Sequence, residues 1–76
     1  MFILVEVIER EVSVSKHNTL EEAQEEMKKN ICEVYHVNDI GEIDEYEDCG
    51  IYKTTAWANT NHPGNCDWYI FDLSKV

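Results

Sequence analysis

Four side chains have the types and the spacing of a zinc site. Cys32 and His36 stand four residues apart, and His62 and Cys66 repeat this spacing near the end of the sequence. Two thiolates and two imidazoles form a common ligand set for structural zinc. The chain has no C-x-x-C pair, however, and the topology expected below separates the two halves of the set by the length of a helix, about 25 Å. We therefore expect no metal site and no cofactor, with Cys32 as a half-exposed thiol.

Motifs for catalysis are nearly absent from the sequence. It has no glycine-rich phosphate loop, no G-x-S-x-G and no H-E-x-x-H. A nucleophile and a base could be drawn from Cys66 and His62, but such a pair also needs an orienting third group and a sheltered pocket. Because a domain of 76 residues has little volume for a pocket of that kind, we do not expect an enzyme.

The segment WANTNHPGNCDW, residues 57–68, gathers polar and aromatic side chains in one place. Pro63 and Gly64 explain a chain reversal, and asparagines tolerate the backbone conformations that turns require. We expect Trp57 and Trp68 to face each other across two paired strands, at the base of this turn. The alternative is a recognition loop for a small ligand, a metal or a partner, formed by Trp57, Asn59, Asn61, His62 and Trp68.

The charge is strongly acidic and unevenly distributed. The chain has 16 Asp and Glu against 6 Lys and Arg, a net charge of −10, and 11 of these acids but 2 of these bases lie within residues 19–49. Phosphates repel such a chain, so we expect no direct binding to nucleic acid or to a membrane. Carboxylates along a helix and a loop can instead imitate a nucleic-acid backbone and bind a basic surface of a host protein. The residues expected to do so are Glu25, Glu26, Glu33, Asp44, Glu45 and Glu47. The plain alternative is that the charge keeps a small domain soluble.

The elements that position these residues can be predicted from the apolar pattern. Residues 2–8 form a buried strand, which extends further or folds over near residues 9–11. Thr19 and Glu22 fit a capping box, and a helix over about residues 20–36 follows. Residues 38–50 are an acidic loop with room for one helical turn, and residues 51–58 and 67–73 are strands joined by the turn described above.

This order predicts one α+β domain over residues 1–76, with a β-α-β-β arrangement. A three-stranded, mostly antiparallel sheet carries one long helix on one face. The expected core is Ile3, Val5, Val7, Leu20, Ala23, Met27, Ile31 and Val34, with Phe71 and Leu73 or their neighbours of opposite parity. Since one helix covers only one face of a sheet, some aromatic side chains should stay open for a homodimer or another partner.

The cellular compartment is also expected from the sequence. Three cysteines do not form the even-numbered framework of a secreted scaffold. The start MFILVEVIERE lacks the basic region of a signal peptide, and no apolar run is long enough to span a membrane. We expect a reduced, soluble protein of the cytoplasm.

The stretches TLEEAQEEM, AWAN and DWYIF resemble those of short uncharacterised acidic proteins from low-GC gut bacteria and their phages and mobile elements. These stretches are structural, so the resemblance implies no catalytic or binding residue. It implies a small protein that binds and blocks a host protein, including host proteins that handle nucleic acid.

Overall fold

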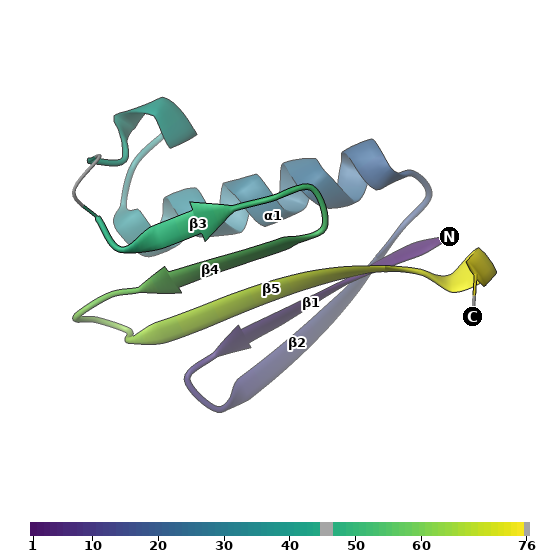
Figure 1. The fold of residues 1–76 in the computed structure, drawn as a ribbon, viewed down its shortest axis with the longest axis horizontal. Helices are drawn as coiled ribbons and strands as arrows, with labels where there is room; N and C mark the ends of the chain where they lie inside the picture. Colours follow the sequence, from purple (N-terminus) through teal and green to yellow (C-terminus); the bar gives the residue numbers. More distant parts are fainter. Residues whose placement is uncertain (45–46, 76) are drawn as a thin grey trace.

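The computed structural model describes residues 1–44 and 47–75, and there it shows one antiparallel sheet with one long helix on one face (Figure 1). The elements are β1 Phe2–Ile8, β2 Glu11–His17, α1 Leu20–Tyr35, the 3₁₀ turn η1 Ile40–Glu42, β3 Cys49–Ile51, β4 Thr55–Asn59, β5 Asn65–Asp72 and the 3₁₀ turn η2 Leu73–Lys75. The strand order is β2-β1-β5-β4-β3. The predicted α+β class is therefore confirmed, whereas the prediction of three strands is wrong, because the sheet has five.

The two additional strands come from two chain reversals: the first is the fold-over near residues 9–11, one of the two alternatives that the sequence allowed, and the second was not predicted. At Glu9 the backbone adopts a positive φ of 57°, and β2 folds back on β1, so that Val5 pairs with Val14. The predicted single strand over residues 51–58 is likewise divided by a tight turn, in which the Tyr52 N–H donates to the Thr55 carbonyl at 2.8 Å. Each reversal converts one expected strand into a hairpin.

The sheet turns one set of alternating side chains toward α1. Leu4 pairs with Ile70, and Trp68 lies between Glu6 on β1 and Ala56 on β4. Leu4, Ile70, Trp68 and Ala56 form the buried core together with residues of the helix. The helix contributes Ala23, Met27 and Ile31, as the sequence predicts. The prediction that Ile3, Val5 and Val7 belong to this core is wrong: they point to the other face and are half-buried. In residues 2–8, both the odd-numbered and the even-numbered positions carry apolar side chains. The alternation of side chains therefore does not indicate which face of the strand is buried.

The helix begins and ends where its capping residues lie. The Glu22 N–H donates to Thr19 Oγ1 at 3.1 Å, which satisfies an amide of the first turn. Glu22 Oε2 accepts from the N–H of Asn18, the residue before the N-cap, at 3.1 Å. The helix ends at Tyr35, and His36 adopts the left-handed conformation there. Cys32, expected to be half-exposed, is buried, because the chain after the helix and β3 lie along its flank.

Candidate functional site

Three segments that are distant in the sequence meet at one end of the domain. These are the C-terminal end of α1, the acidic loop that follows it and the tip of the β4–β5 hairpin, all on the left in Figure 1. The expectation that the helix end and the hairpin tip lie at opposite ends is wrong. Because β2 precedes the helix and runs antiparallel to β1, α1 runs back toward the end at which β1 finishes and β5 begins.

A cleft of about 450 Å³ lies between the acidic loop and the hairpin tip. Glu47 and Asp48 line one side, and Asn61 and His62 line the other. Asn59 joins the two sides, because its backbone N–H donates to the Asp48 carbonyl at 2.9 Å and its side-chain amide donates to Asp48 Oδ2 at 3.3 Å. The last turn of the helix contributes Val34, Tyr35 and His36. The cleft thus combines carboxylates, amide groups and an apolar portion.

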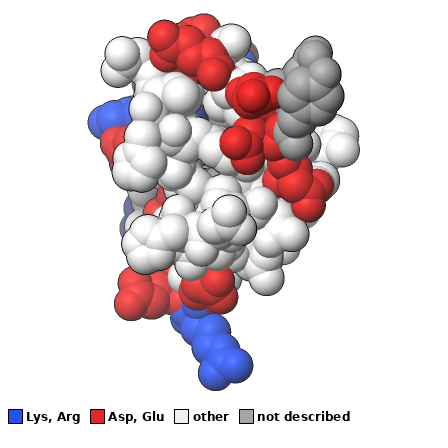
Figure 2. Space-filling model, turned by 90° about the vertical axis from the view of Figure 1, so that its left-hand side faces the viewer, with Lys and Arg blue, Asp and Glu red and all other residues white. Residues whose placement is uncertain are grey.

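The predicted acidic residues are only partly gathered at this end. Glu25, Glu33, Asp44 and Glu47 are exposed, but Glu26 is half-buried on the other flank of α1, where it lines a small pocket with Ser13 and Ser15 of β2. Glu45 lies outside the described residues. Figure 2 looks at the end that carries the loops and shows acidic side chains around its upper part and right-hand edge, and a further acidic group at the bottom beside a basic side chain.

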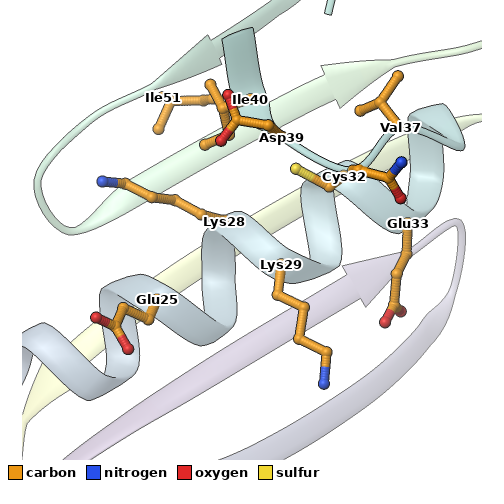
Figure 3. A pocket seen from close by; sticks show the side chains of 10 residues that line it. Glu25, Lys28, Lys29, Cys32, Glu33, Val37, Asp39, Ile40 and Ile51 are labelled. Atoms are coloured by element: carbon orange, nitrogen blue, oxygen red, sulfur yellow. The ribbon is translucent and has the colours of Figure 1, made fainter. Parts of the chain in front are cut away.

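Two lysines interrupt the acidic surface along the middle of the helix. Lys28 and Lys29 follow Glu25 and precede Glu33 on α1 (Figure 3), beside a groove of about 550 Å³ between α1, the η1 segment and Ile51 of β3. Beyond this point the acids continue without a base through the loop. We call this group the acidic end; its described members are Glu33, Asp39, Glu42, Asp44, Glu47 and Asp48.

The position of the acidic end is electrostatically costly. The unsatisfied carbonyls of a helix C-terminus carry partial negative charge, so basic residues are favoured there and acids are disfavoured. The last turn of α1 has no basic residue, and it contains Glu33. Asp39 and Glu42 follow at once and cap the 3₁₀ turn, where Glu42 Oε2 accepts from the Asn38 N–H at 2.7 Å. Negative potential is therefore concentrated beside the cleft.

The two tryptophans of the hairpin do not form the predicted pair. Trp57 is opposite Asp67, whereas Trp68 is opposite Ala56, so the two rings lie on different faces of the sheet. Trp68 is fully buried, and its indole N–H donates to Glu6 Oε1 at 2.8 Å. Trp57 is 37% exposed on the other face. Of the five residues predicted for a recognition loop, Asn59, Asn61 and His62 line the cleft and the tryptophans do not.

The four side chains considered for zinc do not come together either. His36 and His62 line the same cleft, but Cys66 is buried under the helix and Cys32 is buried on the flank of α1. Within residues 1–44 and 47–75, no three His, Cys, Asp or Glu side chains are placed to hold a metal ion. His36 and Asp48 belong to the cleft although the sequence did not assign them to it, and their proximity depends on the strand order.

A buried phenol and a buried thiol lie under the cleft. Burial raises the pKa of Tyr35 well above its ordinary range, and the neighbouring Cys49 thiol adds to the effect. The Tyr35 hydroxyl has no hydrogen-bond partner of good geometry among the described residues. Burial also raises the pKa of the Cys66 thiol, with smaller contributions from Glu6 and Asp67. Both groups are therefore held in their neutral forms.

We expect the domain to lose stability in alkaline solution because of these two groups. Unfolded cysteine and tyrosine ionise near pH 8.5 and 10, respectively. Between those values and the raised folded pKa values, the unfolded chain releases protons that the folded chain keeps, so the free energy of unfolding falls as pH rises. Urea unfolding at pH 7, 9, 10 and 11 measures the effect, and Tyr35→Phe should reduce the fall between pH 10 and pH 11. A free energy of unfolding that stays constant from pH 7 to pH 10 would contradict this account.

Comparison with protein-family models, with curated proteins and with solved structures found no match. No helix in the described part of the chain has the length and apolar character needed to cross a membrane. The geometry of the cleft and of the faces around it is therefore the basis for a functional argument.

Proposed function

We propose that this chain is a protein-binding module whose acidic end occupies a basic, nucleic-acid-binding surface of another protein. The observation that carries the proposal is the cleft, which is lined both by Glu47 and Asp48 of the acidic loop and by Asn61 and His62 of the hairpin tip. From the sequence, the acidic residues and the hairpin are two alternative binding sites. Their position on two sides of one cleft supports a single site that uses both.

The chemistry of the cleft suits an arginine or lysine side chain of the partner. Glu47 and Asp48 can accept charge-assisted hydrogen bonds from a guanidinium group, and the amide of Asn61 can add a neutral one. Val34 and Tyr35 offer an apolar surface against which the aliphatic part of a long basic side chain can pack. The exposed carboxylate of Glu33 extends the same negative field beyond the cleft.

The cost of the acidic end supports a role beyond solubility. An acid at a helix C-terminus is unfavourable by about 0.3–1 kcal/mol, whereas the same charge placed elsewhere on the surface would improve solubility without this cost. An electrostatic arrangement that lowers stability at one place is typical of a functional site. The resemblance to small proteins of mobile elements points to a host protein that handles nucleic acid as the kind of partner, and to inhibition as the outcome.

The alternative, a small-ligand or metal site in residues 57–68, has less support. The predicted recognition loop includes both tryptophans, and these side chains lie on opposite faces of the sheet. The other three residues of that loop line the same cleft as Glu47 and Asp48; they are Asn59, Asn61 and His62.

The proposal predicts that binding depends on where the charge is removed. In the double variant Glu33→Lys/Glu47→Lys, both changes are at exposed positions of the acidic end, and partner affinity should fall at least about tenfold. The matched control is Glu21→Lys/Glu25→Lys, which changes the net charge equally at exposed positions in the first half of α1, outside the acidic end. This control should lose only a few-fold in affinity, through weaker long-range steering.

The measurement begins with immobilised protein and a bacterial lysate. Proteins retained by the wild type and the control, but not by the acidic-end variant, are identified by mass spectrometry and titrated against all three. A 20-base-pair DNA duplex should displace them, and affinity should fall steeply with salt, because charges are screened within about 8 Å at physiological ionic strength. Equal affinities for the two double variants would overturn the proposal.

A further inference from the structure

The face of the sheet opposite α1 is apolar and uncovered. Its side chains come from four adjacent strands, and they pair in rows, so that Val5 lies between Val14 and Tyr69. Val12 and Val14 are 63% and 59% exposed, and Phe71 is 49% exposed. We call this surface the outer face; its apolar members are Ile3, Val5, Val7, Val12, Val14, Trp57, Tyr69 and Phe71.

The outer face differs in charge from the rest of the molecule. Among its described strand positions the charged side chains are one base, Lys16, and one acid, Asp67, which belong to different rows of the sheet. The chain as a whole has a net charge of −10, and most of that charge lies on α1 and on the acidic loop. The outer face therefore has no excess of negative charge that would attract a basic partner. Two copies of the chain can meet there without bringing their acidic surfaces together.

The size of the outer face approaches that of a small, specific interface. Four strands about 4.8 Å apart, with five to eight residues each, give a flat footprint of roughly 450 Å² before the relief of side chains is counted. The smaller specific interfaces bury about 600 Å² on each partner. Three aromatic side chains lie on the face, and Tyr69 and Phe71 stack with their ring centroids 6.4 Å apart. Rings of this kind are the side chains that dominate binding energy at interfaces.

We propose that the outer face is a homodimer interface, in which two sheets stack face to face about a twofold axis. The two sheets would lie about 10 Å apart with their strands roughly aligned, as in other sheet-on-sheet packings. The helices and the acidic ends would remain on the outside of a four-layered particle. This inference does not depend on the proposed function, because it uses the opposite face of the sheet.

Sedimentation velocity between about 2 and about 200 µM tests the proposal, since a dimer of this kind depends on protomer concentration. We expect the wild type to pass from monomer to dimer within that range. Val14→Glu places a carboxylate on the edge strand β2 of the outer face, in the same row as Val5 and Tyr69, and should weaken the dimer at least tenfold. The matched control Lys29→Gln changes the net charge by the same one unit on the exposed side of α1, and it should change the dimer constant by less than twofold. Far-UV circular dichroism verifies that both variants fold.

Salt separates this dimer from the complex proposed above. Sodium chloride screens the repulsion between two copies of charge −10, so higher salt should strengthen the dimer, whereas it should weaken a complex with a basic partner. A wild type that stays monomeric over the whole range would overturn the inference. So would a dimer that Val14→Glu leaves unchanged, because its interface would then lie elsewhere.

Discussion

Replacing Trp68 by alanine is expected to lower the free energy of unfolding by about 3–5 kcal/mol, a large part of the stability of a domain of this size. Trp68 is the largest fully buried side chain and lies at the centre of the sheet, between Glu6 and Ala56. Truncating a buried tryptophan costs about 3–5 kcal/mol, because apolar burial is lost and a cavity remains. A domain of 76 residues is stable by only about 4–11 kcal/mol. The loss also leaves the Glu6 carboxylate without the indole N–H that now donates to it at 2.8 Å.

The second tryptophan provides the control for this prediction. Trp57 lies on the outer face, 37% exposed, with its indole over Gly50. Trp57→Ala should lower the free energy of unfolding by only about 1 kcal/mol, as is usual for partly exposed positions. Urea denaturation followed by far-UV circular dichroism measures both variants without relying on tryptophan emission. Losses of equal size would show that the assignment of the two faces is wrong.

Gly64→Ala is expected to have the second largest effect on stability. Gly64 has a φ of +123°, a conformation that side chains rarely adopt, and an added Cβ would collide with the carboxylate of Glu9. That carboxylate accepts a hydrogen bond from the Asn65 N–H at 3.1 Å, while the Glu9 N–H donates to the Asn65 carbonyl at 2.8 Å. The substitution therefore strains the hairpin tip and separates it from the β1–β2 turn. We expect a loss of about 2 kcal/mol or more.

Two controls test this prediction, a substitution at another glycine and the same substitution in a Glu9 variant. Gly41 has no positive φ, and a Cβ there would touch only a side-chain oxygen of Asp39 at 3.0 Å, so Gly41→Ala should cost less than about 1 kcal/mol. In a Glu9→Gly background the collision disappears and only the backbone strain remains, so Gly64→Ala should become less costly. Thermal or urea unfolding of the four combinations gives the coupling between the two positions. Additive losses would mean that Glu9 and Gly64 do not touch.

The helix was predictable because its signals are local. Thr19 and Glu22 form the expected cap, and the apolar spacing placed Ala23, Met27 and Ile31 in the core, where they are fully buried. Each of these signals lies within a few residues of the structure that it specifies. No knowledge of the rest of the chain is needed to recognise them.

The strands were harder to predict because their faces are decided by distant partners. Residues 2–8 carry apolar side chains at both parities, and only the position of α1 makes Leu4 core and Val5 surface. The reversal at Glu9 uses a positive φ at a residue for which this is uncommon, and no glycine, proline or asparagine marks it. Because the predicted order of elements lacks β2, it also gives the helix the wrong direction relative to β1.

In the candidate site, too, the sequence indicated the segments but not how they come together. Residue types were sufficient to single out the acidic loop and the asparagine-rich turn. Their meeting in one cleft depends on strand order, and the separation of Trp57 from Trp68 depends on a register in which Trp57 is opposite Asp67. A shift of one residue in that register exchanges the faces of every side chain on a strand.

The interior position of β1 in the sheet has a consequence for how the chain folds during synthesis. β1 lies between β2 and β5, and its other edge is completed by pairs as distant as Phe2 with Asp72. The Leu73 N–H also donates to the Met1 carbonyl at 3.0 Å, and the two ends of the chain lie together in Figure 1. On a ribosome that adds about 5–20 residues per second, the first strand emerges several seconds before its last neighbour exists. Until residues 65–72 are released, Leu4 has only β2 and the helix beside it, so the nascent chain exposes apolar surface that a chaperone could recognise.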